Sequence, residues 1–178
     1  MDEVKIRKKR DSRRQILFSR DSACLQGLTM LMEAASHRAL VLWALDCASG
    51  TLEAFEAGRP GDARPRLALE RSAAWARGEI KMPEARRAIL DAHAVAKDVG
   101  ERRLGALAHA IGHACATVHV KTHAPGLPFY ELTAIRLGAG EDWEGAVVRR
   151  IGFYTERLLY WNEHADDPGR VWAKFLLK

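Results

Sequence analysis

The chain has 178 residues, 48% of them hydrophobic and 29% charged, so it can bury one ordinary core and is most simply a single domain over residues 1–178. No apolar run reaches the roughly 18 residues that cross a membrane, and the amino-terminal end is charged where a signal peptide would be apolar, so we expect neither a membrane span nor a signal peptide and favour the cytoplasm. The three cysteines lie far apart in apolar helical surroundings, so we expect buried, reduced thiols.

The net charge of +5 is confined to a basic amino-terminal arm, residues 1–20. This arm holds eight Lys or Arg against three Asp or Glu, so the remaining chain is neutral. Neither interleaved aromatic residues nor a base-reading motif accompanies these charges, and we therefore expect no nucleic-acid partner. A solvated arm is the simpler interpretation, and an acidic protein partner could use the same charges to speed encounter.

Apolar residues recur at helical spacing along the chain, and strand signals are nearly absent. This pattern predicts an all-α fold, a single bundle of about seven to eight helices. We expect the first helix from about residue 11 or 12 to residue 35. Ser36 follows, where it can cap the second helix.

The second helix is expected to bury a side that includes Trp43 and Phe55. The pair Ser49-Gly50 predicts an irregularity or an early stop, because glycine weakens a helix interior. Asp46 lies near the buried side, and we expect it to pair with an arginine.

Two helices then form a predicted antiparallel hairpin. Pro65 and Pro83 suit the first turn of each helix, where a missing backbone donor costs nothing. Gly78 and Gly100 stand where each apolar stripe ends, as residues that can adopt positive φ. Asp62 precedes the first of these helices and can accept a hydrogen bond from its first turn.

This hairpin carries a dense set of polar side chains. The candidate binding residues are Asp62, Arg64, Arg66, Glu70, Arg77, Glu79, Arg86 and His93. Arg86 and His93 are seven residues apart, so they lie within about 20° of each other around the helix. The set would form either a recognition surface or anion-binding groove, or a salt-bridged network that fixes the hairpin against its neighbours.

The fifth helix, about residues 101–120, is apolar or small nearly all round, which predicts a buried central helix rich in alanine and histidine. Two histidines four residues apart can share a metal ion, and the candidate ligands here are His113, His119 and His123. No carboxylate lies between them as in zinc proteases, and the nearest cysteine faces elsewhere. Buried imidazoles bonded to acidic or backbone groups are the simpler interpretation, and we expect no cofactor.

The carboxyl-terminal third predicts two more helices and a short last segment. They span about residues 128–137 and a long amphipathic stretch that starts near residue 142. Arg149 and Arg150 are expected to point mostly outward from the long helix. Residues 171–177 carry aromatic side chains that must be covered by the domain or by a second subunit, which would make a homo-oligomer.

Several motifs together resemble the putative immunity protein family of bacterial polymorphic toxin systems, over about residues 37–137. The motifs are Leu40-x-x-Trp43-Ala44-x-Asp46-Cys47-Ala48, Asp62-x-Arg64-Pro65-Arg66-x-Ala68-x-Glu70, Trp75-x-Arg77-Gly78-Glu79-Ile80, Glu84-Ala85-Arg86, Ala92-His93-Ala94, Gly112-His113-Ala114 and His119-Val120-x-Thr122-His123-Ala124. The resemblance implies an all-helical protein that binds and neutralises a cognate toxin. It supplies no active-site residue.

Two functions therefore remain open from the sequence. The first is an immunity protein that is not an enzyme and acts by protein–protein binding. The second is a small-molecule- or metal-binding helical protein, which could extend to catalysis, that uses the Arg86 and histidine side chains. The second function requires these side chains to meet in one pocket.

Overall fold

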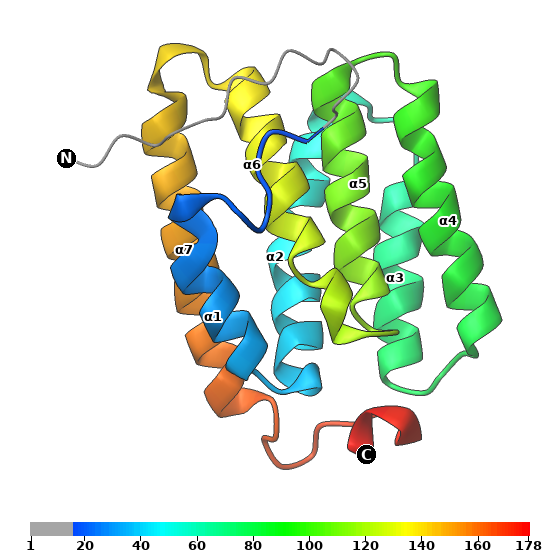
Figure 1. Ribbon diagram of the computed structural model, residues 1–178. Coiled ribbons are helices and arrows are strands. Elements are labelled where there is room, and N and C mark those ends of the chain that lie inside the picture. The colour runs from blue at the N-terminus through cyan, green and yellow to red at the C-terminus, as the bar shows by residue number, and fades with distance from the viewer. Residues whose placement is uncertain (1–15) are drawn as a thin grey trace.

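A computed structural model describes residues 16–178, in which helices are the only regular secondary structure (Figure 1). The seven α-helices of this part are α1 (Gln26–Ala34), α2 (His37–Gly58), α3 (Arg64–Ala76), α4 (Met82–Asp98), α5 (Arg102–Ala116), α6 (Gly126–Gly138) and α7 (Trp143–His164). Four short 3₁₀ helices accompany them: η1 (Ala23–Leu25) before α1, η2 (Lys121–His123) between α5 and α6, η3 (Gly140–Asp142) between α6 and α7, and η4 (Lys174–Leu177) after α7. The predicted all-α bundle is confirmed. None of the helices in residues 16–178 is long and apolar enough to span a bilayer.

Helix α5 is the centre of the bundle, as expected. It lies between α4 and α6, with α2 and α3 behind it (Figure 1). Most of its side chains are buried, and alanine or glycine at many positions lets the neighbouring helices approach closely. Two larger apolar clusters result. One is shared by α1, α2, α5, α6 and α7, and the other is formed mainly by α2, α3, α4 and α5.

The predicted hairpin of α3 and α4 is also confirmed. Pro65 and Pro83 both occupy the first turn of their helices. Gly78 and Gly100 adopt φ angles of +78° and +55°, which residues with a side chain rarely adopt. The backbone N–H of Arg64 donates to the Asp62 side chain at 3.3 Å, so Asp62 accepts a bond from the first turn as expected.

The first helix is shorter than the sequence pattern predicts. Residues 1–15, with most of the basic arm, lie outside the described residues, and α1 begins only at Gln26. The expectation of a helix over residues 16–22 is wrong. The Leu17 backbone N–H donates to the Thr133 hydroxyl at 2.9 Å, and Phe18 is buried in the core, so this segment is held by tertiary contacts.

Helix α2 does not stop at Ser49-Gly50, contrary to the prediction, and continues to Gly58. Thr51, Leu52 and Phe55 beyond the glycine are buried. Burial of this turn outweighs the roughly 1 kcal/mol that glycine costs in a helix interior. At the other end of the helix, the Ser36 hydroxyl accepts from the Ala39 backbone N–H at 3.1 Å, which confirms the cap.

The last segment folds back against the domain. The Ala173 backbone N–H donates to the Ala76 carbonyl at 2.8 Å, and Leu176 is buried beside Trp75 and Val118. Trp172 packs against the same cluster. The same chain therefore covers Trp172 and Leu176, whereas Phe175 packs on Trp75 and stays 37% exposed, and a homo-oligomer stays a prediction.

Candidate functional site

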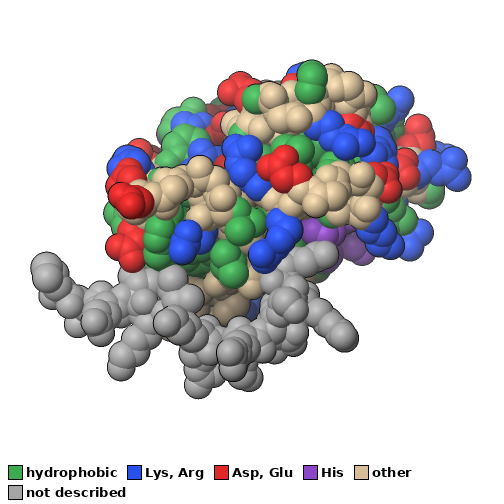
Figure 2. Space-filling view, turned by 90° about the horizontal axis from the view of Figure 1, so that it is seen from above, with side chains coloured by type: hydrophobic (Ala, Val, Ile, Leu, Met, Phe, Trp, Pro, Cys, Tyr) green, Lys and Arg blue, Asp and Glu red, His purple; other side chains and the backbone are tan. Residues whose placement is uncertain are grey.

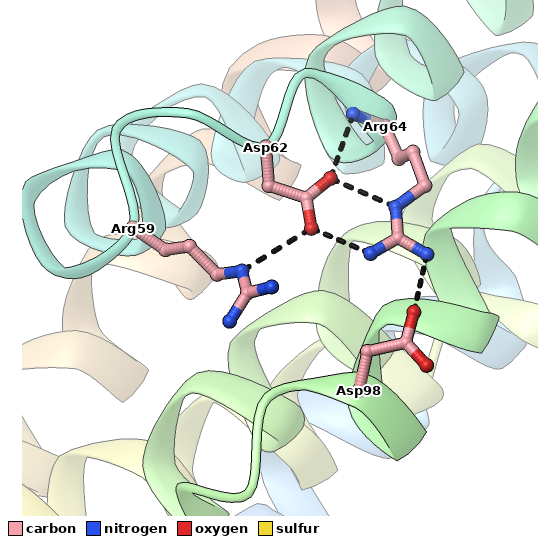
Figure 3. Close-up of polar contacts among 4 residues, drawn as sticks. All are labelled: Arg59, Asp62, Arg64 and Asp98. Carbon is pink, nitrogen blue, oxygen red and sulfur yellow. Dashed lines mark hydrogen bonds and ion pairs between the residues drawn. The ribbon is translucent and has the colours of Figure 1, made fainter.

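Asp62 and Arg64 form the centre of an ion-pair network that joins the loop before α3 to the end of α4 (Figure 3). Asp62 Oδ1 accepts from the Arg64 backbone N–H and from Arg64 Nε, the latter at 2.8 Å. Asp62 Oδ2 accepts from Arg64 Nη2 at 2.6 Å and from Arg59 Nε at 3.3 Å. Arg64 Nη1 donates to Asp98 Oδ2 at 2.6 Å, so one guanidinium bridges two carboxylates.

These contacts keep the network ionised. The hydrogen bonds from the Arg64 side chain are the main reason that the pKa of Asp62 falls to about 2. The same bonds raise the pKa of Arg64. Because both carboxylate oxygens of Asp62 are directed at arginines, these residues form the salt-bridged network rather than an open anion groove.

The other ion pairs of the hairpin are local and separate from this network. Arg66 on α3 pairs with Glu56 on α2 through two parallel hydrogen bonds. Arg77 pairs with Glu79 across the turn, at 2.5 and 2.8 Å, and both side chains are about half exposed. Solvent-exposed pairs of this kind contribute little to stability, because water screens the charges.

The remaining hairpin candidates do not join the ion pairs. Arg86 is exposed and makes no ion pair with any residue of 16–178, and Glu70 is exposed near Arg66. His93 faces α5 and belongs to a different group. The structure therefore divides the eight candidates among several places along the hairpin.

A cluster of four histidines, which we call the histidine cluster, lies between α4, α5, η2 and α6. Its members are His93, His109, His113 and His123, and the Tyr130 ring packs against His109 and His113. The Nδ1 atoms of His93 and His109 are 2.9 Å apart. The His113 ring lies edge-on to the His93 ring and stacked on Tyr130, each at a centroid distance of 5.1 Å.

Two glycines make room for these rings. A methyl group added at Gly112 would lie 2.6 Å from ring atoms of His93, and one at Gly126 would lie 2.3 Å from His113. Neither ring can withdraw without leaving its neighbours, since each is packed on its other side by another imidazole. The sequence motif Gly112-His113 therefore supplies one histidine and the space for another.

We expect Gly112→Ala to lower the free energy of unfolding by about 1–3 kcal/mol relative to Gly152→Ala, measured by urea unfolding. Both glycines lie inside long helices, so the gain in helix propensity is common to both variants. A methyl at Gly152 meets no atom within 4 Å, whereas one at Gly112 overlaps His93. Equal stabilities of the two variants would contradict the packing described.

Burial keeps the histidine cluster neutral. Desolvation, followed by the neighbouring imidazoles, lowers the pKa of His93 and of His113 to about 4. Burial likewise lowers the pKa of His109 and of His123. A hydrogen bond between two Nδ1 atoms requires one to carry a proton and the other a lone pair, so His93 and His109 adopt opposite tautomers and share one proton.

The three candidate metal ligands do not converge. His113 and His123 are neighbours, with ring centroids 5.7 Å apart, but His119 is exposed and stacks on Trp75. Within residues 16–178, no three His, Cys, Asp or Glu side chains are placed to hold a metal ion. The Nδ1 atoms of His93 and His109 face each other at hydrogen-bond distance, an arrangement that a shared proton satisfies.

A small pocket opens beside the histidine cluster, where α4 ends and α5 begins. It has a volume of about 200 Å³ and reaches His109 and Tyr130. Lys97, Glu101 and Arg102 lie at its edge. From above, histidine side chains reach the surface next to Lys and Arg side chains (Figure 2).

A second buried polar group, which sequence reasoning missed, connects α6 and α7. Glu131 is 6% exposed and accepts hydrogen bonds from Arg150 Nη2, at 3.1 Å, and from the Tyr154 hydroxyl. Arg150 Nη2 also donates to the Cys47 carbonyl of α2 at 3.0 Å. The Trp43 indole N–H donates to the Tyr154 carbonyl at 2.9 Å. The expectation that Arg150 points outward is wrong, because it reaches inward to Glu131.

Burial, reinforced by the Glu131 carboxylate, raises the pKa of Tyr154 far above its ordinary value, so the hydroxyl remains a donor. One sequence signal could have identified this group: Glu131 is the only acidic residue in α6, among apolar neighbours. On the outer side of the same bundle, Asp46 accepts from Arg157 Nε at 2.6 Å, which confirms the predicted arginine partner.

The protein is a small helical bundle, and many polar side chains of the sequence motifs form contacts between its helices. The chain belongs to the family described as Imm-5 like putative immunity protein, whose model matches residues 30–155. This range runs from within α1 to within α7 and contains the Asp62 network, the histidine cluster and Glu131. No curated protein and no solved structure matches the chain at a significant level.

Proposed function

We propose that this chain is an immunity protein that neutralises a cognate bacterial toxin by binding to it directly. The observation that carries the proposal is the family match over residues 30–155, more than two thirds of the chain. The arrangement of the motif residues supports it. Arg64 on α3 bonds Asp98 at the end of α4, and the clustered histidines contact one another across helices, which leaves the outer surface for recognition of a partner.

We also propose that the chain is not an enzyme. An activated acid or base needs a pKa near the working pH and access to a substrate. The contacts of Asp62 keep it ionised, and burial keeps His93 and His113 neutral with pKa values near 4. These groups serve as fixed structural partners in our account.

The proposed place of action is the bacterial cytoplasm, where the toxin would otherwise act on its host. The three cysteines are free thiols, and Cys47 and Cys115 are buried, which suits a reducing compartment. The basic arm would bring an acidic toxin surface closer before contact, so the association rate should fall as salt is added.

A small-molecule-binding function is the second candidate, and one observation favours it. His93, His109, His113 and His123 do meet in space, beside a pocket that His109 lines. Arg86 and His119, the other side chains on which this function depended, lie elsewhere. The pocket is considered further below.

The proposed function is tested by co-expression in bacterial cells with the toxin domain encoded next to this gene. We expect cells that produce both proteins to grow and cells that produce the toxin alone to stop growing. A catalytically inactive toxin domain carrying an affinity tag should retain this chain through purification, because the proposed mechanism is binding. Protection and retention are both required.

The matched control is another immunity protein of similar size, expressed at the same level with the same toxin. It should give neither protection nor a complex. Growth arrest in the presence of this folded chain would contradict the proposed function, and so would its loss from the tagged toxin.

A further inference from the structure

We propose that the pocket between the end of α4 and the start of α5 is a binding site for one compact anion, carrying a carboxylate or a phosphate group. The cations of this pocket are Lys97 and Arg102, against one acidic side chain, Glu101. Neither cation makes an ion pair with a residue of 16–178, in contrast to Arg64, Arg66 and Arg77 on α3 and its following turn. The pocket therefore offers two cationic donors that are not already engaged.

Backbone donors add to this positive potential. Helix α5 starts at Arg102, and its N-cap residue, Glu101, makes no side-chain hydrogen bond to the first turn. The first N–H groups of a helix lack intrahelical acceptors and carry the positive end of the helix dipole. Gly100 lines the pocket and is exposed, so bare backbone is open to a ligand there.

The inner wall of the pocket supplies a fixed polar group. His109 Nδ1 is bonded to His93, which leaves His109 Nε2 as the nitrogen available to a ligand. If His109 donates the shared hydrogen bond, its Nε2 has a lone pair and can only accept. If His93 donates that bond, His109 carries its hydrogen on Nε2, which can then donate to the anion. The Tyr130 ring packs against His109 at a centroid distance of 4.9 Å and holds it in place.

The volume of the pocket limits the ligand. At about 200 Å³ it is smaller than the roughly 300–1,000 Å³ of sites for drug-sized molecules, so a whole nucleotide or dinucleotide cofactor does not fit within its walls. A single carboxylate or phosphate group does. Such a group can come from a free small anion or from an acidic side chain of a protein partner.

The test uses inorganic phosphate and acetate as probes, titrated at pH 7 into the full chain with chloride adjusted to hold ionic strength constant. The readout is the backbone amide NMR signals of Gly100 and Gly105. We expect saturable shifts with half-saturation at or below about 1 mM for at least one probe. The double variant Lys97→Gln, Arg102→Gln should bind at least about tenfold more weakly, because each cation supplies a charge-assisted hydrogen bond.

The matched control is Arg87→Gln, which removes a positive charge from an exposed position of α4 away from the pocket. It should leave the titration unchanged. The proposal is overturned if neither probe shifts these signals saturably at roughly 50 mM, or if the double variant binds as well as the parent chain. Neither result depends on the toxin, so this site can fail while the proposed function stands.

A second arm identifies the source of the anion. If the toxin supplies it, the double variant should bind the inactive toxin domain about tenfold more weakly than Arg87→Gln does, and phosphate should compete with the complex. If a free anion is the ligand, toxin binding should be the same in both variants while phosphate binding is lost.

Discussion

The variant Glu131→Ala is expected to lose about 3–5 kcal/mol of unfolding free energy. Glu131 is 6% exposed, and its carboxylate accepts from Arg150 and from the hydroxyl of Tyr154. Removal of the carboxylate leaves the guanidinium of Arg150, whose side chain is 19% exposed, without its counter-ion inside the bundle. Urea unfolding followed by circular dichroism measures the loss.

The adjacent arginine provides the control. Arg149 pairs with Asp142, but these side chains are 68% and 74% exposed, so Asp142→Ala should cost well under about 1 kcal/mol. The double variant Glu131→Leu, Arg150→Met should recover much of the lost stability, because a buried ion pair replaced by apolar groups is often neutral. A loss for Glu131→Ala as small as that for Asp142→Ala would show that Glu131 is not buried against Arg150.

Mild acid is expected to destabilise this protein strongly, and the histidine cluster is the reason. His93 and His113 have pKa values near 4 in the folded chain, below the ordinary value of 6.5, because burial disfavours the imidazolium. The unfolded chain therefore binds more protons between these values. Stability should be complete above about pH 6.5 and fall as the pH drops toward 4.

The size of this effect follows from the two shifts. At pH 5, His93 and His113 each lower the free energy of unfolding by roughly 2 kcal/mol. Together they remove up to about 4 kcal/mol, a large part of the stability of an ordinary domain. The free energy of unfolding from urea titrations at several pH values between 7 and 4.5 measures it. Protonation of Asp62 also lowers stability, but only at lower pH, because its pKa is about 2 in the folded chain and 3.8 ordinarily.

Two variants separate the histidine cluster from other titrating groups. His93→Gln with His113→Gln should flatten the dependence of stability on pH over this range, whatever its effect on stability at pH 7. The control His164→Gln removes a histidine that lies outside the cluster, near the surface, where its Nδ1 bonds the Tyr160 carbonyl. A parent protein equally stable at pH 7 and pH 5 would be incompatible with buried neutral imidazoles.

The helices whose boundaries are set by local chemistry could be predicted from the sequence. Pro65, Gly78, Pro83 and Gly100 constrain the backbone directly, and each marks a helix end in the structure. Gly50 imposes no such constraint, because glycine merely weakens a helix, and the buried residues after it keep α2 intact. The segment around Phe18 is set by contacts with α6, which no local pattern records.

The candidate site was predictable in its residue types more than in its geometry. The charged residues of the hairpin were identified, but their partners Glu56 and Asp98 lie on α2 and at the far end of α4. His93 and His113 were identified as candidates on separate helices, but helical spacing could not show that their rings meet. Arg150 was assigned to the surface because its partner, Glu131, lies on another helix.

We propose that the polar groups buried between the helices hold the bundle together and that the outer surface of the bundle binds a toxin. Isothermal titration of the purified chain with the inactive domain of the neighbouring toxin tests it most directly. The account predicts one-to-one binding with a Kd of about 10 nM or below. Absence of binding at about 10 μM, with both proteins shown to be folded, would contradict it.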